Sequence, residues 1–154
     1  MTGDELRALF RAVPSPVSVV TVDLAGQAVG LTVDSIVPLS IEPPLVGIAL
    51  NRHAALHELL REAGAFAISV LASGQEHLAQ HFARGVPPIG LWTGIETGKG
   101  DLEAPLIEGA LGWIECRLAS ELEAGDHTFF VGEVTSVRRG PGREALVHVG
   151  GGYA

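Results

Sequence analysis

The chain has 154 residues, of which 47% are apolar and 18% are charged, and its formal net charge is −8. This length and composition predict one globular domain with its own hydrophobic core and exclude a disordered chain. The acidic balance argues against a nucleic-acid or anionic-membrane binder, because both need a basic face, and no apolar run approaches the ~20 residues of a membrane span.

The N-terminal segment predicts an amphipathic helix followed by a strand. The helix is expected over residues 4–13, ending at Pro14, because apolar residues recur there at i, i+3, i+4 and i+7. These residues are Leu6, Leu9, Phe10 and Val13. The β-branched run 17–23 is the first predicted strand. No basic stretch precedes an apolar run here, so we expect no signal peptide and a cytoplasmic protein.

Two further β-prone runs, 28–37 and 45–50, flank a turn that the adjacent prolines 43 and 44 fix, because proline excludes helix and cannot donate to a sheet. Three small polar side chains, Thr32, Asp34 and Ser35, interrupt the first of these strands, and Asn51 and Arg52 follow the second. Polar groups at strand ends commonly bind ligands. On the residues alone, a ligand-binding edge and a plain hairpin with a polar solvent face are equally supported.

The middle of the chain predicts two helices on either side of a buried strand. The first helix covers 54–64, with Gly64 as its C-cap, and the strand covers 65–72. Ser73 and Glu76 have the spacing of a capping box and predict a second helix that runs to about residue 84.

The segment 85–101 is expected to be irregular, because it contains two adjacent prolines and several glycines, and a loop of this length is usually functional. Beyond it, runs 111–121 and 127–138 predict a long hairpin, with a bulge or kink at Gly132. A last strand is expected at 145–149. About seven strands with two or three helices indicate one mostly-β domain of the α+β class over residues 1–154, with a barrel-like sheet.

Two histidine pairs have the i, i+4 spacing with which imidazoles on one helix face can chelate a metal. They are His53 with His57, and His77 with His81. The second pair lacks the inner glutamate of the metalloprotease pattern, and we favour surface histidines over a metal site for both. The lone Cys116 lies in an apolar run and is expected to be a core residue rather than a nucleophile.

The sequence Gly-Asp-His-Thr at 125–128 places His127 directly after a hairpin turn, beside an acid. Asp126 could tune this imidazole or form an Asx-turn. Neither glycine-rich run, 98–100 or 150–152, opens a helix, so a Rossmann phosphate-binding turn is excluded and any nucleotide or flavin must bind in another way.

Taken in order, these segments resemble the flavin reductase family of the FMN-binding split barrel. Residues 30–35 (GLTVDS), followed by 38–40 and 43–45, are similar to the flavin-binding signature of that family. The other matching segments are 10–11, 16–21, 65–71, 75–83, 109–117, 125–134 and Tyr153, which together span nearly the whole chain.

This resemblance implies a split, Greek-key β-barrel of about six to seven antiparallel strands with two or three flanking helices. It also implies a homodimer that transfers hydride from NADH or NADPH to FMN or FAD and often supplies reduced flavin to a partner monooxygenase. The sequence leaves open which flavin and which nicotinamide are used, and whether flavin is a prosthetic group or a diffusing substrate.

The resemblance assigns residues to the ligands. Those expected to line the isoalloxazine are Gly30, Leu31, Thr32, Val33, Asp34 and Ser35, with Thr32 near N5. Those expected at the polar edge of the ring or the ribityl chain are Leu50, Asn51 and Arg52. Those expected near the phosphate are Phe82, Ala83 and Arg84. His127, the candidate catalytic residue, and Tyr153 are expected to border the nicotinamide site.

The chain departs from the family pattern at two places. Asp34 stands where the family commonly has a small hydroxyl residue or asparagine, and a carboxylate there repels reduced flavin or phosphate unless it points away. Residues 53–55 lack the hydroxyl expected before the second helix. The alternative hypothesis is therefore a non-catalytic split barrel that binds flavin or another small ligand at a weakened site.

Overall fold

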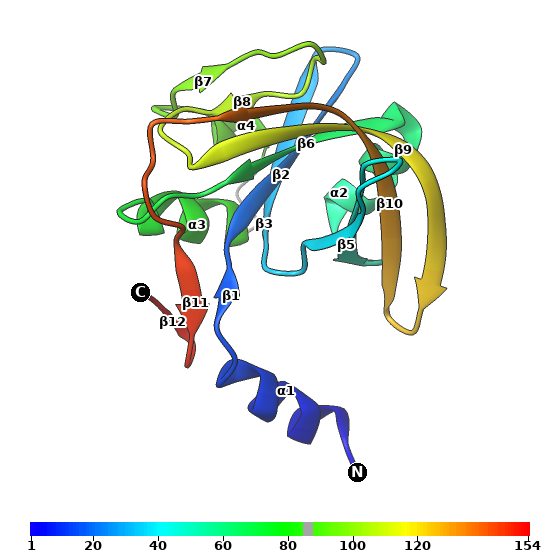
Figure 1. Ribbon diagram of the computed structural model, residues 1–154, viewed down its shortest axis with the longest axis vertical. Coiled ribbons are helices and arrows are strands. Elements are labelled where there is room, and N and C mark those ends of the chain that lie inside the picture. Colours follow the sequence, from blue (N-terminus) through cyan, green and yellow to red (C-terminus); the bar gives the residue numbers. More distant parts are fainter. Residues whose placement is uncertain (85–87) are drawn as a thin grey trace.

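The computed structural model describes residues 1–84 and 88–154 (Figure 1). The helices are α1 (Gly3–Arg11), α2 (Ala55–Ala63), α3 (Glu76–Ala83) and α4 (Pro88–Leu91). The first strands are β1 (Ser15–Pro16), β2 (Ser18–Leu24), β3 (Gln27–Val33), β4 (Val37–Ser40), β5 (Leu45–Asn51) and β6 (Ala65–Val70). The remaining strands are β7 (Thr97–Gly98), β8 (Leu106–Ile107), β9 (Gly112–Ala124), β10 (His127–Arg139), β11 (Val147–Val149) and β12 (Gly152–Tyr153).

Seven strands form one antiparallel sheet in the order β3-β2-β6-β9-β10-β5-β4. Two small sheets, β1-β11-β12 and β7-β8, lie outside it. The expected fold class, mostly β with flanking helices, is confirmed, as is the long β9–β10 hairpin.

The sheet closes on itself because its two edge strands, β3 and β4, are joined by only residues 34–36. The four Cα steps from Val33 to Val37 can reach at most about 15 Å, so the edges must come together. At this corner the Ser35 hydroxyl makes the hydrogen bonds that the backbone of a neighbouring strand would otherwise make. It donates to Ala49 O at 2.9 Å and accepts from Ala49 N at 3.1 Å, on β5 beyond the end of its pairing with β4.

This corner corrects the single strand expected over 28–37. The strand ends at Val33, and Val37 belongs to β4, which pairs with β5. The physical reason is the polar pair Asp34 and Ser35. The Ser35 hydroxyl donates a hydrogen bond to Ala49 O on β5, and the chain crosses there from one edge of the sheet to the other.

The barrel interior holds the main hydrophobic cluster. Its buried members are Val20, Val22, Val33, Val46, Ile48, Leu50, Leu56, Leu60, Phe66, Ile68, Cys116 and Phe130. Burial raises the pKa of the Cys116 thiol to about 12, with the neighbouring Glu115 charge adding to the effect. A neutral, buried thiol is a poor nucleophile, so Cys116 is the core residue that the sequence predicts.

The expectation of surface histidines is wrong for His57, which is 2% exposed. Its Nε2 lies 2.7 Å from Thr128 Oγ1 and its Nδ1 lies 3.0 Å from Glu58 Oε1, so both ring nitrogens have partners. A buried imidazole with both nitrogens paired is tolerated in a core. His57 therefore ties α2 to β10.

Two local predictions differ from the structure. The capping box at Ser73 is wrong, because α3 starts after Gln75 and receives no side-chain cap. Gly74, at φ +96°, turns the chain between Ser73 and Gln75. The Glu76 carboxylate, which the capping box would direct to the Ser73 N–H, accepts a hydrogen bond from the Gly74 N–H through Oε1. The segment 85–101 is not wholly irregular, since it contains α4 and β7, although residues 85–87 lie outside the described part of the chain.

Helix α1 extends away from the barrel (Figure 1) and buries none of its residues. Its expected apolar face forms but is left exposed by the residues that the structure describes: Leu9 and Phe10 are 65% and 60% exposed. Across the described residues, no helix has the length and apolar character needed to cross a membrane.

Gly132 provides a first test of the packing, because the β9–β10 register shifts there and its Cα faces the core. A Cβ at this position would lie 2.6 Å from Phe66 Cζ and 2.8 Å from Cys116 Cβ. We expect Gly132→Ala to lower the free energy of unfolding by about 1–3 kcal/mol, as overpacking does. Urea unfolding measures this, with Gly3→Ala, which meets nothing within 4 Å, as the control.

Ser35 provides a second test, of the barrel closure. Ser35→Ala removes the partner of both Ala49 backbone groups, and we expect it to cost about 1–3 kcal/mol of unfolding free energy. Ser120→Ala, at an exposed position for which the described residues show no side-chain hydrogen bond, is the matched control. Equal unfolding midpoints for the two variants would contradict this account of the corner.

Candidate functional site

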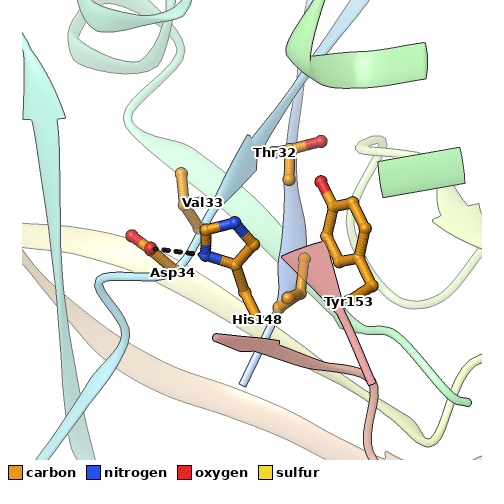
Figure 2. A pocket seen from close by; sticks show the side chains of 6 residues that line it. Thr32, Val33, Asp34, His148 and Tyr153 are labelled. Atoms are coloured by element: carbon orange, nitrogen blue, oxygen red, sulfur yellow. Dashed lines mark ion pairs between the residues drawn. The ribbon is translucent and has the colours of Figure 1, made fainter. Parts of the chain in front are cut away.

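A cleft of about 170 Å³ opens where β3 ends and the C-terminal strands pass by (Figure 2). Its lining residues are Val17, Thr32, Val33, Asp34, His148 and Tyr153. Three of the residues assigned to the flavin and one assigned to the nicotinamide therefore border one cleft.

The alternation of β3 divides its residues between two faces. Leu31 and Val33 pack against the main core. Gly30 and Thr32 face α3: a Cβ on Gly30 would lie 3.0 Å from the Phe82 ring, and Thr32 Oγ1 donates to Ala79 O at 2.6 Å. Because that proton is committed, the Thr32 oxygen has only lone pairs left and can accept a hydrogen bond from a ligand.

Asp34 follows the last core residue of β3 and its side chain is 59% exposed. Its Oδ2 lies 3.9 Å from His148 Nδ1, and Figure 2 shows the two side chains facing each other across the cleft rim. Ser35 points the other way, toward β5, and is occupied by the barrel corner. Of the two polar residues, Asp34 is the one that borders the cleft.

The C-terminal strands form the opposite wall. His148 on β11 pairs with Ser15 of β1 and with Tyr153 of β12, and its ring centroid lies 5.3 Å from that of Tyr153. His148 was not among the residues predicted from the sequence. The available signal was weak: a single imidazole in the apolar run 146–149, just before the glycines of the tail.

The residues expected at the ring edge lie near His127, on another part of the molecule from the cleft. Asn51 on β5 pairs with His127 on β10. The Asn51 side chain accepts a hydrogen bond from the His53 N–H at 2.8 Å. Arg52 Nη1 donates to Oε1 of the exposed Glu123 at 3.3 Å, and Leu50 is buried in the core.

His127 Nδ1 lies 2.7 Å from Asp126 Oδ1. This hydrogen bond, together with the charge of the imidazole, lowers the pKa of Asp126. The Asp126 carboxylate is therefore directed at the His127 ring in the structure.

The residues expected near the phosphate lie at the end of α3. Phe82 is 2% exposed and packs against Trp92, with ring centroids 5.2 Å apart, so its side chain supports α3 rather than opening to solvent. Ala83 and Arg84 are exposed, and Arg84 borders a separate cavity of about 300 Å³ with His77 and His81.

One chain thus brings Thr32, Val33, Asp34 and Tyr153 together but does not place His127 in the same cleft. Figure 1 shows β12 and the β9–β10 turn on opposite sides of that view. The roles assigned to the twelve flavin-binding residues, to Tyr153 and to His127 stay predictions. Within residues 1–84 and 88–154, no group of three or more histidine, cysteine or acidic side chains is arranged to hold a metal.

Comparison with known proteins agrees with this geometry. The chain is 40% identical over 157 aligned positions to the NADH-dependent FAD reductase of Streptomyces globisporus, covering 97% of this chain and 83% of that protein. It is 38% identical to the reductase component of 4-hydroxyphenylacetate 3-monooxygenase of Thermus thermophilus, covering 90% and 87%.

Solved structures give the same result. The NADH:FAD oxidoreductase of Streptomyces globisporus C-1027 superposes with a TM-score of 0.92 at 38% identity, covering 98% of this chain and 91% of that one. BorF, the flavin reductase component of a bacterial two-component tryptophan halogenase, also gives 0.92, at 35% identity and with 99% and 97% coverage. The profile of the flavin reductase like domain matches residues 10–154. The chain therefore belongs to the flavin reductase family.

Proposed function

We propose that this protein is a flavin reductase that transfers hydride from NADH or NADPH to FMN or FAD. The observation that carries the proposal is the cleft at the barrel closure, where Thr32, Val33 and Asp34 of the flavin-binding signature meet Tyr153. The family match over residues 10–154 and relatives named as NADH-dependent FAD and FMN reductases support the same chemistry.

When bound, the flavin and the nicotinamide supply the reacting atoms, because hydride passes from nicotinamide C4 to flavin N5. The protein then has to bind, orient and shield them. The Thr32 oxygen offers an acceptor to the cleft, the Tyr153 ring offers an aromatic surface, and the buried Val33 fixes the floor. These groups fit a planar, partly apolar ligand with polar edges.

The residues also support a homodimer. The cleft of about 170 Å³ is smaller than the roughly 300–1,000 Å³ of most small-molecule sites, so one chain supplies only part of an enclosure. Helix α1 leaves an uncovered apolar face, and a nine-residue helix is marginal by itself. We infer that a second copy covers α1 and brings further residues toward the cleft.

Relatives that are reductase components of a monooxygenase and of a halogenase system support a place in a two-component system. On this proposal the protein releases reduced flavin in the cytoplasm to a partner oxygenase. The alternative, a binding protein without turnover, is favoured by the Asp34 carboxylate at the cleft rim, and the assay below separates the two.

The first prediction here concerns activity. Purified protein mixed with NADH or NADPH and with FMN or FAD should consume the reduced nicotinamide, because the cleft and the family both fit hydride transfer. The decay of reduced-nicotinamide absorbance measures this, with a flavin-free reaction as the control. Flavin binding without turnover in all four combinations would favour the alternative, and neither binding nor turnover would refute both.

The second prediction concerns the dimer. We expect the wild-type chain to sediment as a dimer and Leu9→Glu to weaken association by at least about tenfold, since burying an unpaired charge is unfavourable. Ala8→Glu is the matched control, because it adds the same charge to the opposite face of α1. Analytical ultracentrifugation measures both variants. A monomeric wild type, or equal effects of the two substitutions, would contradict the role of α1.

A further inference from the structure

The cleft contains two residues of opposite potential charge that face each other, Asp34 and His148. We propose that His148 is a positioning residue of the flavin site: it holds the Asp34 carboxylate at the rim and offsets the repulsion between that carboxylate and the bound flavin. This inference rests on the proposed function, since it assumes that flavin occupies the cleft. It assigns a role to a residue outside the flavin-binding signature.

The geometry brings the pair together from distant parts of the chain. Asp34 follows β3 at one sheet edge, and His148 lies in the middle of β11. The side chains are 59% and 31% exposed, and Nδ1 of His148 lies 3.9 Å from Oδ2 of Asp34. The carboxylate therefore has an imidazole within ion-pair distance at the place where it meets the cleft.

The imidazole is held on its other sides. Its backbone is paired with both Ser15 and Tyr153, so it occupies the central strand of the three-stranded sheet. Its ring lies 5.3 Å from the Tyr153 ring at an interplanar angle of 55°. A side chain restrained in this way can fix the position of Asp34. The direction follows from the exposures, because the Asp34 side chain is the more exposed of the two.

The charges of the residues that line the cleft determine how the Asp34–His148 pair affects flavin binding. Of the described residues that line it, Val17, Thr32, Val33 and Tyr153 are uncharged side chains at neutral pH, so Asp34 has His148 as its basic neighbour there. Reduced flavin is richer in electrons than oxidised flavin and readily loses the N1 proton. A carboxylate without a partner therefore disfavours reduced flavin more than oxidised flavin.

The test is a double-substitution cycle in the full chain, with FMN as the probe. His148→Phe keeps an aromatic ring against Tyr153 and removes the nitrogen that faces Asp34. We expect it to weaken binding of anaerobically reduced FMN by about two- to fivefold, the range of exposed ion pairs, with a smaller effect on oxidised FMN. Asp34→Asn removes the repelling carboxylate itself and should therefore tighten the binding of reduced FMN.

The double variant decides between positioning and packing. If His148 acts through Asp34, then Asp34→Asn combined with His148→Phe binds reduced FMN as well as Asp34→Asn alone. Asp101→Asn, which removes an exposed acid at a position that does not line the cleft, is the matched control for net charge. Circular dichroism melts verify folding, and His148→Gln replaces His148→Phe if the latter does not fold.

Two failures are distinguishable. A double variant as weak as His148→Phe alone, or equal losses for oxidised and reduced FMN, would overturn the positioning role while leaving flavin reduction intact. A wild-type chain that binds no FMN and no FAD would instead overturn the proposed function and this inference with it.

Discussion

The structure depends on the short crossing from β3 to β4. Residues 34–36 join the two edges of the seven-stranded sheet, so the sheet has to curl into a barrel. The hydrogen bonds between the Ser35 hydroxyl and Ala49 complete the corner where no strand is present to do so. The segment that closes the barrel therefore overlaps the segment that resembles the flavin-binding signature of the family, and Asp34 of this segment lines the cleft.

Two helices are attached to the strands around this corner. Helix α3 is attached to β3 through the Thr32 hydroxyl and the close approach of Phe82 to Gly30, where no side chain would fit comfortably. Helix α2 is attached to β10 through the buried His57. Ligand-facing side chains on β3 thus stand on backbone that is fixed by packing, which is the condition for precise binding.

Most of the fold could be predicted from the sequence because its strands are long apolar runs, and the order of short motifs identified the family over nearly the whole chain. Two of the errors share a cause: the burial of His57 and the place of His148 depend on neighbours far away in sequence. His57 is buried against Thr128, which lies 71 positions further along the chain. His148 borders the cleft because β11 pairs with β1. Neither contact leaves a local pattern. The break after Val33 was missed because the apolar run resumes at Ile36.

The pairing of β1, β11 and β12 has one more consequence. It ties the start and the end of the chain together: Gly150 N donates to Arg11 O at 2.6 Å, and Ala154 exchanges two backbone hydrogen bonds with Val147. Because Tyr153 lines the cleft, any residues that follow Ala154 would begin two positions after a side chain that lines it. An affinity tag or fused domain at the carboxyl end would therefore be a neighbour of the ligand, whereas one before α1 would start a full helix away.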